Sequence, residues 1–225
     1  MCLNNFRIGL MVCTGLFFVT LHMAAQQDSE EVPRQYVFPV FTRGSVVMKN
    51  GITKPSVLNY NTVTQEMIFE QNGKRLALDR LGTIDTVIIN RRKFIPVGEV
   101  FYELALEAPV SLFIQHKSDI TSEGKPIGYG TTRQTTSSTS FSKLMETNAI
   151  YDLKLPDEFY VTGSSINWIR INGTMMKFIT RRQFLKIFPE QEDELKQYIK
   201  GNKIDLKDRE DLIQLVVYCN ELNPE

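Results

Sequence analysis

Cysteine and histidine are scarce in this sequence, and their scarcity excludes several kinds of site. The 225 residues hold three cysteines and two histidines. Cys2, Cys13 and His22 lie in an N-terminal segment with the pattern of a cleaved signal peptide, so the mature chain would keep only Cys219 and His116. One cysteine cannot form an internal disulfide, and zinc sites of cysteine and histidine need three or four such ligands. Only a carboxylate site for calcium or magnesium stays open, and no cofactor is expected.

Excess charge of either sign is also lacking. The chain has 26 basic and 26 acidic residues, and loss of Arg7 with the N-terminal segment leaves 25 basic ones. Proteins that bind nucleic acid carry a concentrated basic surface, so a nucleic-acid partner is not expected. Arg91-Arg92-Lys93 and Arg181-Arg182 are interpreted as solvated charges at a turn and a helix start. A patch that binds acidic glycans or lipid headgroups, and so a peripheral contact with a membrane, is the alternative if these two clusters converge.

The N-terminus has the parts of a secretory signal peptide. Arg7 precedes an apolar run from Ile8 to Leu21, and the small residues Ala24 and Ala25 follow it. The run is shorter than the about 20 apolar residues that a membrane-spanning helix needs. We therefore predict that residues 1–25 are a signal peptide and that the protein is exported to the periplasm, the outer membrane or the cell surface. An uncleaved N-terminal anchor is the alternative.

Residues 36–179 are predicted to form an antiparallel β domain behind a loose polar arm at residues 26–35. Short runs of β-branched and aromatic residues alternate with polar ones and are separated by turn signals. Asn50-Gly51, Asn72-Gly73 and Asn172-Gly173 favour type I′ hairpin turns, because both central residues of that turn need positive φ. Such hairpins would form a sandwich or a partly open barrel. The run from Val100 to Leu106 fits a strand, with a short helix as the alternative.

The polar stretch NYNTVTQE at residues 59–66 fits a turn better than a ligand site. Asn61-Thr62-Val63-Thr64 separates two strand patterns, and asparagine side chains often bond nearby backbone groups in turns. A binding role for Asn59 and Tyr60 at the end of the strand is the alternative.

The β pattern fails between residues 118 and 147. Nine of the twelve residues from Thr131 to Ser142 are serine or threonine. Such a stretch buries too little apolar surface to offset the entropy lost on ordering it. We predict a long exposed loop that is either disordered or functional, with Tyr129 and Phe141 as its candidate interaction residues.

Helical spacing replaces the strand pattern in residues 180–225. Apolar residues recur every three or four positions, Pro189 can open a helix and Gly201 can end one. Asp205 or Asp208 would cap a last helix that carries Cys219 on its apolar stripe, where a free cysteine behaves as a small hydrophobic side chain. The sequence therefore predicts a mainly β fold with a C-terminal cap of two to three helices.

Three segments carry a family resemblance. They are the opening Phe41-x-x-Gly44-x-Val46, the element LNYNTVTQEMIF with Ile84-Asp85-x-Val87-x-Ile89 and Phe94 after it, and the tail FLKIFPEQEDELKQYIKGNKIDLKDREDLIQLVVYCNEL. Through these segments, from about Tyr36 to Leu222, the chain resembles a widespread group of uncharacterised exported proteins of Bacteroidetes. The resemblance implies a location in the cell envelope and supplies no catalytic residues.

Three functions remain open. The leading one is a non-catalytic envelope protein that acts on a protein partner through the loop, a sheet edge or the helical cap, because the sequence contains no recognisable catalytic constellation. The second is a glycan- or peptide-binding module with aromatic stacking platforms at Tyr60, Tyr151, Tyr160 and Trp168. The third and least favoured is a hydrolase using carboxylates such as Glu66 or Glu103, which needs two carboxyl groups in one cleft and a raised pKa. His116 is expected at the surface, at a strand end, rather than as a catalyst.

Overall fold

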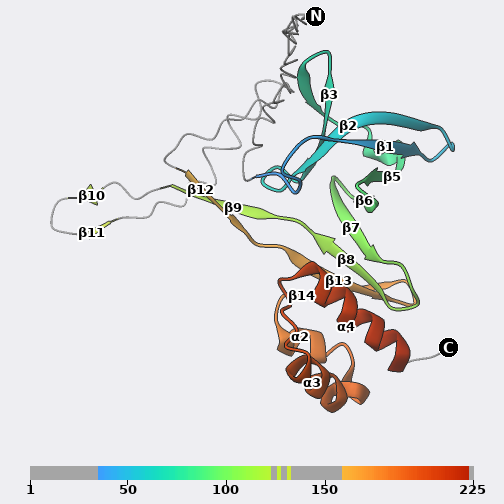
Figure 1. The fold of residues 1–225 in the computed structure, drawn as a ribbon, viewed down its shortest axis with the longest axis vertical. Helices are drawn as coiled ribbons and strands as arrows, with labels where there is room; N and C mark the ends of the chain where they lie inside the picture. Colours follow the sequence, from blue (N-terminus) through green and yellow to red (C-terminus); the bar gives the residue numbers. More distant parts are fainter. Residues whose placement is uncertain (1–34, 123–125, 128–130, 133–158, 223–225) are drawn as a thin grey trace, which may run out of the picture.

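The computed structural model describes residues 35–122, 126–127, 131–132 and 159–222, and its main element is one ten-stranded antiparallel sheet (Figure 1). Its strands are, in chain order, β1 (Thr42–Met48), β2 (Thr53–Asn61), β3 (Glu66–Gln71), β4 (Lys74–Ala77), β5 (Ile84–Ile89), β6 (Arg92–Val97), β7 (Val100–Leu106), β8 (Ser111–Gln115), β13 (Ile166–Ile171) and β14 (Thr174–Phe178). Across the sheet their order is β14-β13-β8-β7-β6-β5-β1-β2-β3-β4. The predicted mainly antiparallel β fold is confirmed, and the sheet does not close into a barrel.

Two short strand pairs accompany the main sheet. β9 (Ser118–Ser122) pairs with β12 (Phe159–Gly163), and β10 (Pro126–Ile127) pairs with β11 (Thr131–Thr132). These strands fall partly inside the stretch predicted as a loop, so that prediction is wrong for β9, β10 and β11. The sequence of β9 is polar, and it becomes a strand because it meets β12, a partner that local pattern cannot reveal. Tyr129 and Phe141 lie outside the described residues.

Two of the three predicted type I′ turns are confirmed. Asn72–Gly73 and Asn172–Gly173 both have positive φ at the two central residues. The prediction is wrong at Asn50, which has no positive φ, although the hairpin itself forms. There the turn has three residues, because Gly51 N donates to Met48 O at 2.9 Å and Gly51 alone takes the left-handed conformation.

The segment between β2 and β3 is a turn, as predicted. Asn61 Oδ1 accepts hydrogen bonds from the backbone nitrogens of Val63 and Thr64, at 3.0 and 3.2 Å. Asn59 has a different role, because its fully buried amide exchanges hydrogen bonds of 2.8 and 3.1 Å with the backbone of Phe38. Asn59 therefore holds the segment that precedes β1 against β2.

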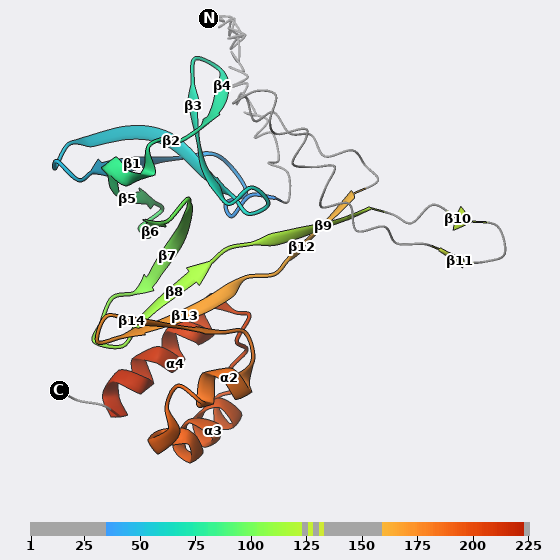
Figure 2. The same ribbon diagram turned by 180° about the vertical axis from the view of Figure 1, so that it is seen from behind.

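Two large apolar cores lie in different parts of the molecule, and a smaller cluster is formed by Tyr102, Leu104 and Phe113. The first is enclosed by the curled strands β1 to β7, and its buried residues are Phe38, Val46, Leu58, Tyr60, Met67, Ile84, Val87, Ile89, Phe94 and Phe101. The β3–β4 hairpin projects away from β1 and β2, as both ribbon views show (Figures 1 and 2). The second core lies between the sheet and the C-terminal helices, and its largest fully buried side chains are Leu112, Ile169, Phe178, Phe184 and Leu195.

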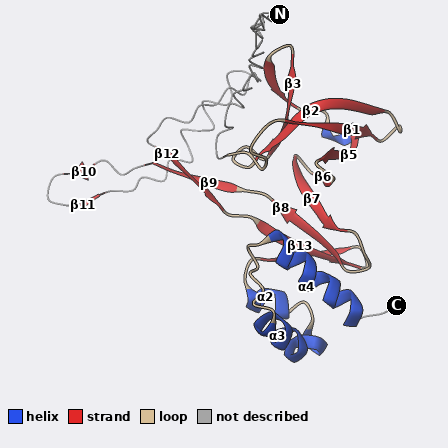
Figure 3. Ribbon diagram, in the orientation of Figure 1, coloured by secondary structure: helices blue, strands red, loops and turns tan. Residues whose placement is uncertain are grey.

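The predicted helical region is confirmed at the C-terminal end, where the helices gather on one side of β8, β13 and β14 (Figure 3). The helices are α2 (Arg181–Leu185), α3 (Glu192–Gly201) and α4 (Arg209–Leu222), with short 3-10 turns η1 (Leu81–Thr83) and η2 (Pro189–Gln191). Thr180 and Gln183 form a capping box at α2. Asp208 caps α4 by accepting from Asp211 N at 3.0 Å, and Cys219 is fully buried in the core, as predicted.

Residues 1–34 lie outside the described part of the chain, so the signal peptide and the polar arm at residues 26–35 stay predictions. None of the helices in the described part has both the length and the continuous apolar character that a bilayer-spanning helix requires.

Candidate functional site

Of the aromatic residues predicted as stacking platforms, the two whose side chains the structure describes, Tyr60 and Trp168, do not share an exposed surface. Tyr60 is fully buried, and its hydroxyl donates to Phe101 O at 3.2 Å. Burial raises the pKa of that hydroxyl above its usual value. Trp168 is half-buried and stacks on Tyr102 with ring centroids 5.6 Å apart. Tyr60 therefore cannot stack a ligand, while Tyr151 and the side chain of Tyr160 lie outside the described residues.

A fully buried carboxylate, Glu103, lies at the centre of a cluster of basic side chains. Arg92 donates to both of its oxygens, with Nε 2.8 Å from Oε1. Arg209 Nε donates to Oε1 at 2.6 Å, and His116 Nε2 lies 2.7 Å from Oε2. We define this group, Glu103 with Arg92, His116 and Arg209, as the Glu103 cluster.

The Glu103 cluster keeps its central carboxylate ionised. Burial acts to raise the pKa of the Glu103 carboxyl, but hydrogen bonds from His116 and Arg92 outweigh it and lower the pKa to about 2. Because an ionised carboxylate only accepts hydrogen bonds, His116 Nε2 must donate to it. Burial also disfavours the charged form of Arg209, yet pairing with Glu103 raises the pKa of its guanidinium.

These observations correct two expectations, for His116 and for Arg92, and they disfavour the hydrolase interpretation at Glu103. That interpretation needs a carboxyl of raised pKa, whereas the pKa of Glu103 is lowered. His116 is not a surface residue, because its side chain is only 15% exposed and contacts Glu103. Arg92 is not a solvated turn residue either, because its side chain is only 21% exposed and pairs with Glu103, whereas Arg91 and Lys93 beside it are exposed. One signal was available in the sequence: Glu103 interrupts the apolar run VFYELAL, and a charge inside a core strand requires basic partners.

A cleft of about 430 Å³ lies over the Glu103 cluster. Its walls come from segments far apart in the sequence, including Thr62, Ser118 and the first residues of α4. The basic residues of the cleft are balanced by acidic ones, because Asp208 and Glu210 line it beside Arg209 and Lys117. The cluster therefore acts chiefly as a link between the sheet and α4, in which Arg209 at the start of the helix binds Glu103 on β7.

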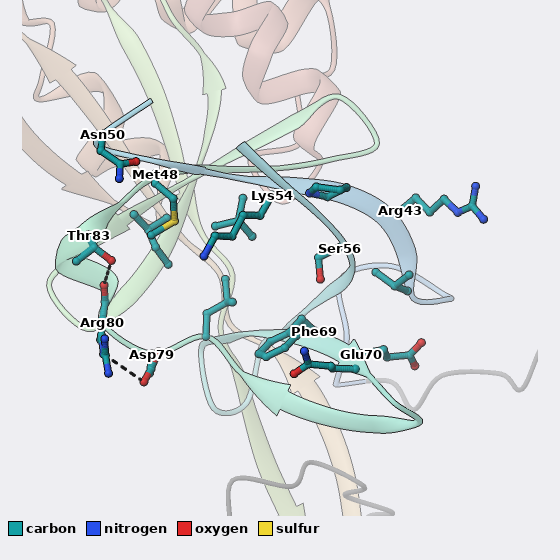
Figure 4. Close-up of a pocket in the computed structure, with 17 residues that line it drawn as sticks. Arg43, Met48, Asn50, Lys54, Ser56, Phe69, Glu70, Asp79, Arg80 and Thr83 are labelled. Atoms are coloured by element: carbon teal, nitrogen blue, oxygen red, sulfur yellow. Dashed lines mark hydrogen bonds and ion pairs between the residues drawn. The ribbon is translucent and has the colours of Figure 1, made fainter. Parts of the chain in front are cut away.

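A larger groove of about 950 Å³ lies between β1–β2 and β3 (Figure 4). Its floor is apolar. Val46 and Ile84 are buried there at 5% and 2% exposure, and Met48, Phe69 and Leu78 are half-buried beside them. Beyond Leu78, the chain after β4 lines one end of the groove with Asp79, Arg80 and Thr83.

Lys54 brings a positive charge into this apolar groove. It lies on β2 opposite Val46 of β1, and Figure 4 shows its ammonium end within the space between β1–β2 and β3. In the described part of the chain, Lys54 and the rim residue Arg43 form no ion pair. The acidic rim residues, in contrast, each have a basic neighbour: Glu70 lies 3.2 Å from Arg75, and Asp79 lies 3.8 Å from Arg80.

Sequence reasoning did not identify the groove. Alternation predicts that Val46 and Met48 share one face of β1, but it places that face in the core. Whether these residues are covered depends on how β1, β2 and β3 curve and on where the chain after β4 runs. A lysine at an inward register position was the single available hint.

Comparisons with known proteins identify no relative. No family model, no curated protein and no solved structure matches this chain. Within the residues that the structure describes, no three histidine, cysteine, aspartate or glutamate side chains gather closely enough to hold a metal ion. The groove and the Glu103 cluster are therefore the features of this chain from which a function can be inferred.

Proposed function

We propose that this protein is a non-catalytic, exported protein of the cell envelope that binds a protein partner in the groove between β1–β2 and β3. The observation that carries the proposal is the groove itself, which combines an apolar floor of five side chains with a charged rim. Concave surfaces that combine apolar walls with a few polar groups are typical binding sites. Export is supported by the signal-peptide pattern of residues 1–25.

The Glu103 cluster argues against Glu103 as a catalytic acid or base. A general acid or base works best with a pKa near the working pH and a free position for the substrate proton. Glu103 has a pKa of about 2, and both of its oxygens accept hydrogen bonds from neighbouring side chains. The cluster is therefore suited to holding α4 on the sheet.

Glycan binding has less support than protein binding. A glycan platform needs exposed aromatic faces. Tyr60 is enclosed in the core, and one face of Trp168 is covered by Tyr102. The groove instead offers aliphatic and thioether side chains, together with Phe69, as its apolar contacts.

Isolation of partners from the cell envelope tests this proposal. Ser56 lines the groove, whereas Thr53 is an exposed residue of the same strand outside it. The tagged chain and the variants Ser56→Trp and Thr53→Trp would be expressed in the source organism and isolated from gently cross-linked envelopes. We expect the chain and Thr53→Trp to retain the same protein partner and Ser56→Trp to lose it, because the indole fills the groove.

Circular dichroism of the three proteins establishes that each is folded. Retention of the partner by folded Ser56→Trp, or equal loss from both tryptophan variants, would contradict the proposal.

A further inference from the structure

The shape of the groove favours an extended peptide over a narrow acyl chain. Its floor residues are buried or half-buried, but its rim lies in solvent, since Arg43, Gln71, Asp79 and Arg80 are all exposed. A ligand in this groove is therefore covered on one side only. An extended peptide suits that arrangement, because alternate side chains point to opposite faces and only one set needs an apolar contact.

The length of β1 beside the groove matches that of a short extended peptide. β1, which forms one side of the groove, has seven residues. A strand advances about 3.3 Å per residue, so a segment of similar length can lie along the groove. Such a segment would direct about three side chains toward the floor.

Lys54 determines the charge that this segment should carry. Lys54 is an exposed residue whose ammonium end lies in the space between β1–β2 and β3, and it has no ion pair within the described residues. A peptide that covers the groove removes water from this charge, which is unfavourable unless the peptide supplies a counter-charge. A carboxylate beside the ammonium group would meet that need and would also select among partners.

We infer that the partner contributes an extended segment with an acidic side chain opposite Lys54 and apolar side chains two residues before and after it. This inference rests on the proposed function and names the chemistry of the partner in the same groove. The chemistry follows from the apolar floor and the unpaired lysine.

Binding of three synthetic peptides tests the inference. The probes are fluorescently labelled Thr-Val-Thr-Glu-Thr-Val-Thr and its two counterparts with glutamine or lysine in place of glutamate, measured by fluorescence anisotropy. The chain should bind the glutamate peptide about tenfold more tightly than the glutamine peptide. Lys54→Glu should reverse the order, so that the lysine peptide binds best. Lys177→Glu makes the same charge change at an exposed position on β14, and should bind like the unmodified chain.

Two controls separate this inference from the proposed function. If all three peptides bind equally to the chain and to Lys54→Glu, while Ser56→Trp blocks them, the acidic segment is wrong but groove binding stands. If no peptide binds, while decanoate binds in a Lys54-dependent manner and decylamine does not, the occupant is an anionic amphiphile and the inference is overturned. Absence of binding by every probe also overturns the inference of an acidic segment. The proposed function is then tested separately by the isolation of partners from the cell envelope.

Discussion

Glu103 carries a negative charge at a position where a strand of the core would ordinarily place an apolar side chain. It is fully buried between Tyr102 and Leu104, which are also buried. An isolated buried carboxylate is unstable as an ion, so its presence requires Arg92, His116 and Arg209 around it. One residue on β7 therefore determines where β6, the end of β8 and the start of α4 must meet.

Removing the charge of Glu103 should destabilise the fold. In Glu103→Gln, Arg92 and Arg209 keep their charges but lose their counter-charge, and breaking such a buried pair costs about 3 kcal/mol of unfolding free energy. Glu107→Gln is the matched control, because Glu107 is 62% exposed and pairs only with Lys93 in the described part of the chain. An exposed pair contributes about 0–1 kcal/mol. Urea unfolding of the three proteins measures the difference, and equal effects at the two positions would refute the assigned role.

The stability of the protein should fall in acid because of the same carboxyl. Its pKa is about 2 in the folded protein, below its usual value of 4.5. A lowered folded-state pKa stabilises the fold above the unfolded pKa, and this stabilisation is lost as the pH falls from about 4.5 toward 2. We expect the difference in unfolding free energy between the unmodified chain and Glu103→Gln to shrink over this interval. A difference that stays constant down to about pH 2.5 would contradict the prediction.

At the scale of elements, β1 depends on a close approach to β5 at Gly44. Gly44 pairs with Ile89 of β5 and with Ser56 of β2. A Cβ atom at this position would lie 2.3 Å from the carbonyl oxygen of Ile88 and 3.2 Å from Leu58 Cδ1. The backbone oxygen cannot move away without disturbing the sheet, so glycine is needed here for space.

Gly44→Ala should therefore lower the unfolding free energy by about 1–3 kcal/mol, as overpacking commonly does. Gly82→Ala is the control, because a Cβ there meets no atom within 4 Å and Gly82 has no positive φ. Surface substitutions of this kind usually change stability by about 0.5 kcal/mol or less. Thermal and urea unfolding measure the two variants. If Gly44→Ala is as stable as Gly82→Ala, β1 and β5 can move apart at Gly44 without loss of unfolding free energy, and the prediction is wrong.

Elements with local signals could be predicted from the sequence, and those formed by distant pairing could not. Two Asn-Gly turns, the Asp208 cap and the buried Cys219 follow from near neighbours in the chain. The strand β9 is polar and depends on β12, so the pattern alone indicates a loop. The turn at Asn50 differs from the prediction because a third residue, Lys49, joins the loop.

At the scale of the whole molecule, the candidate site arises from curvature that no single segment encodes. The groove combines residues of β1, β2, β3 and the chain after β4, and the Glu103 cluster combines β6, β7, His116 and α4. Sequence analysis could identify Glu103 as a residue that needs an explanation, but not its three partners. Lys54 was a hint in the sequence, but nothing local shows that the floor around it stays uncovered.

Whether a protein partner occupies the groove between β1–β2 and β3 is tested most directly by photo-crosslinking from inside the groove in living cells of the source organism. A photo-reactive amino acid would replace Met48, on the groove floor, and in a separate protein Lys177, exposed on β14 at the far edge of the sheet. The account predicts a reproducible adduct with one protein from position 48 only, attached to a segment with an acidic residue within two positions of the crosslink. No adduct from position 48, or the same adducts from both positions, would contradict it.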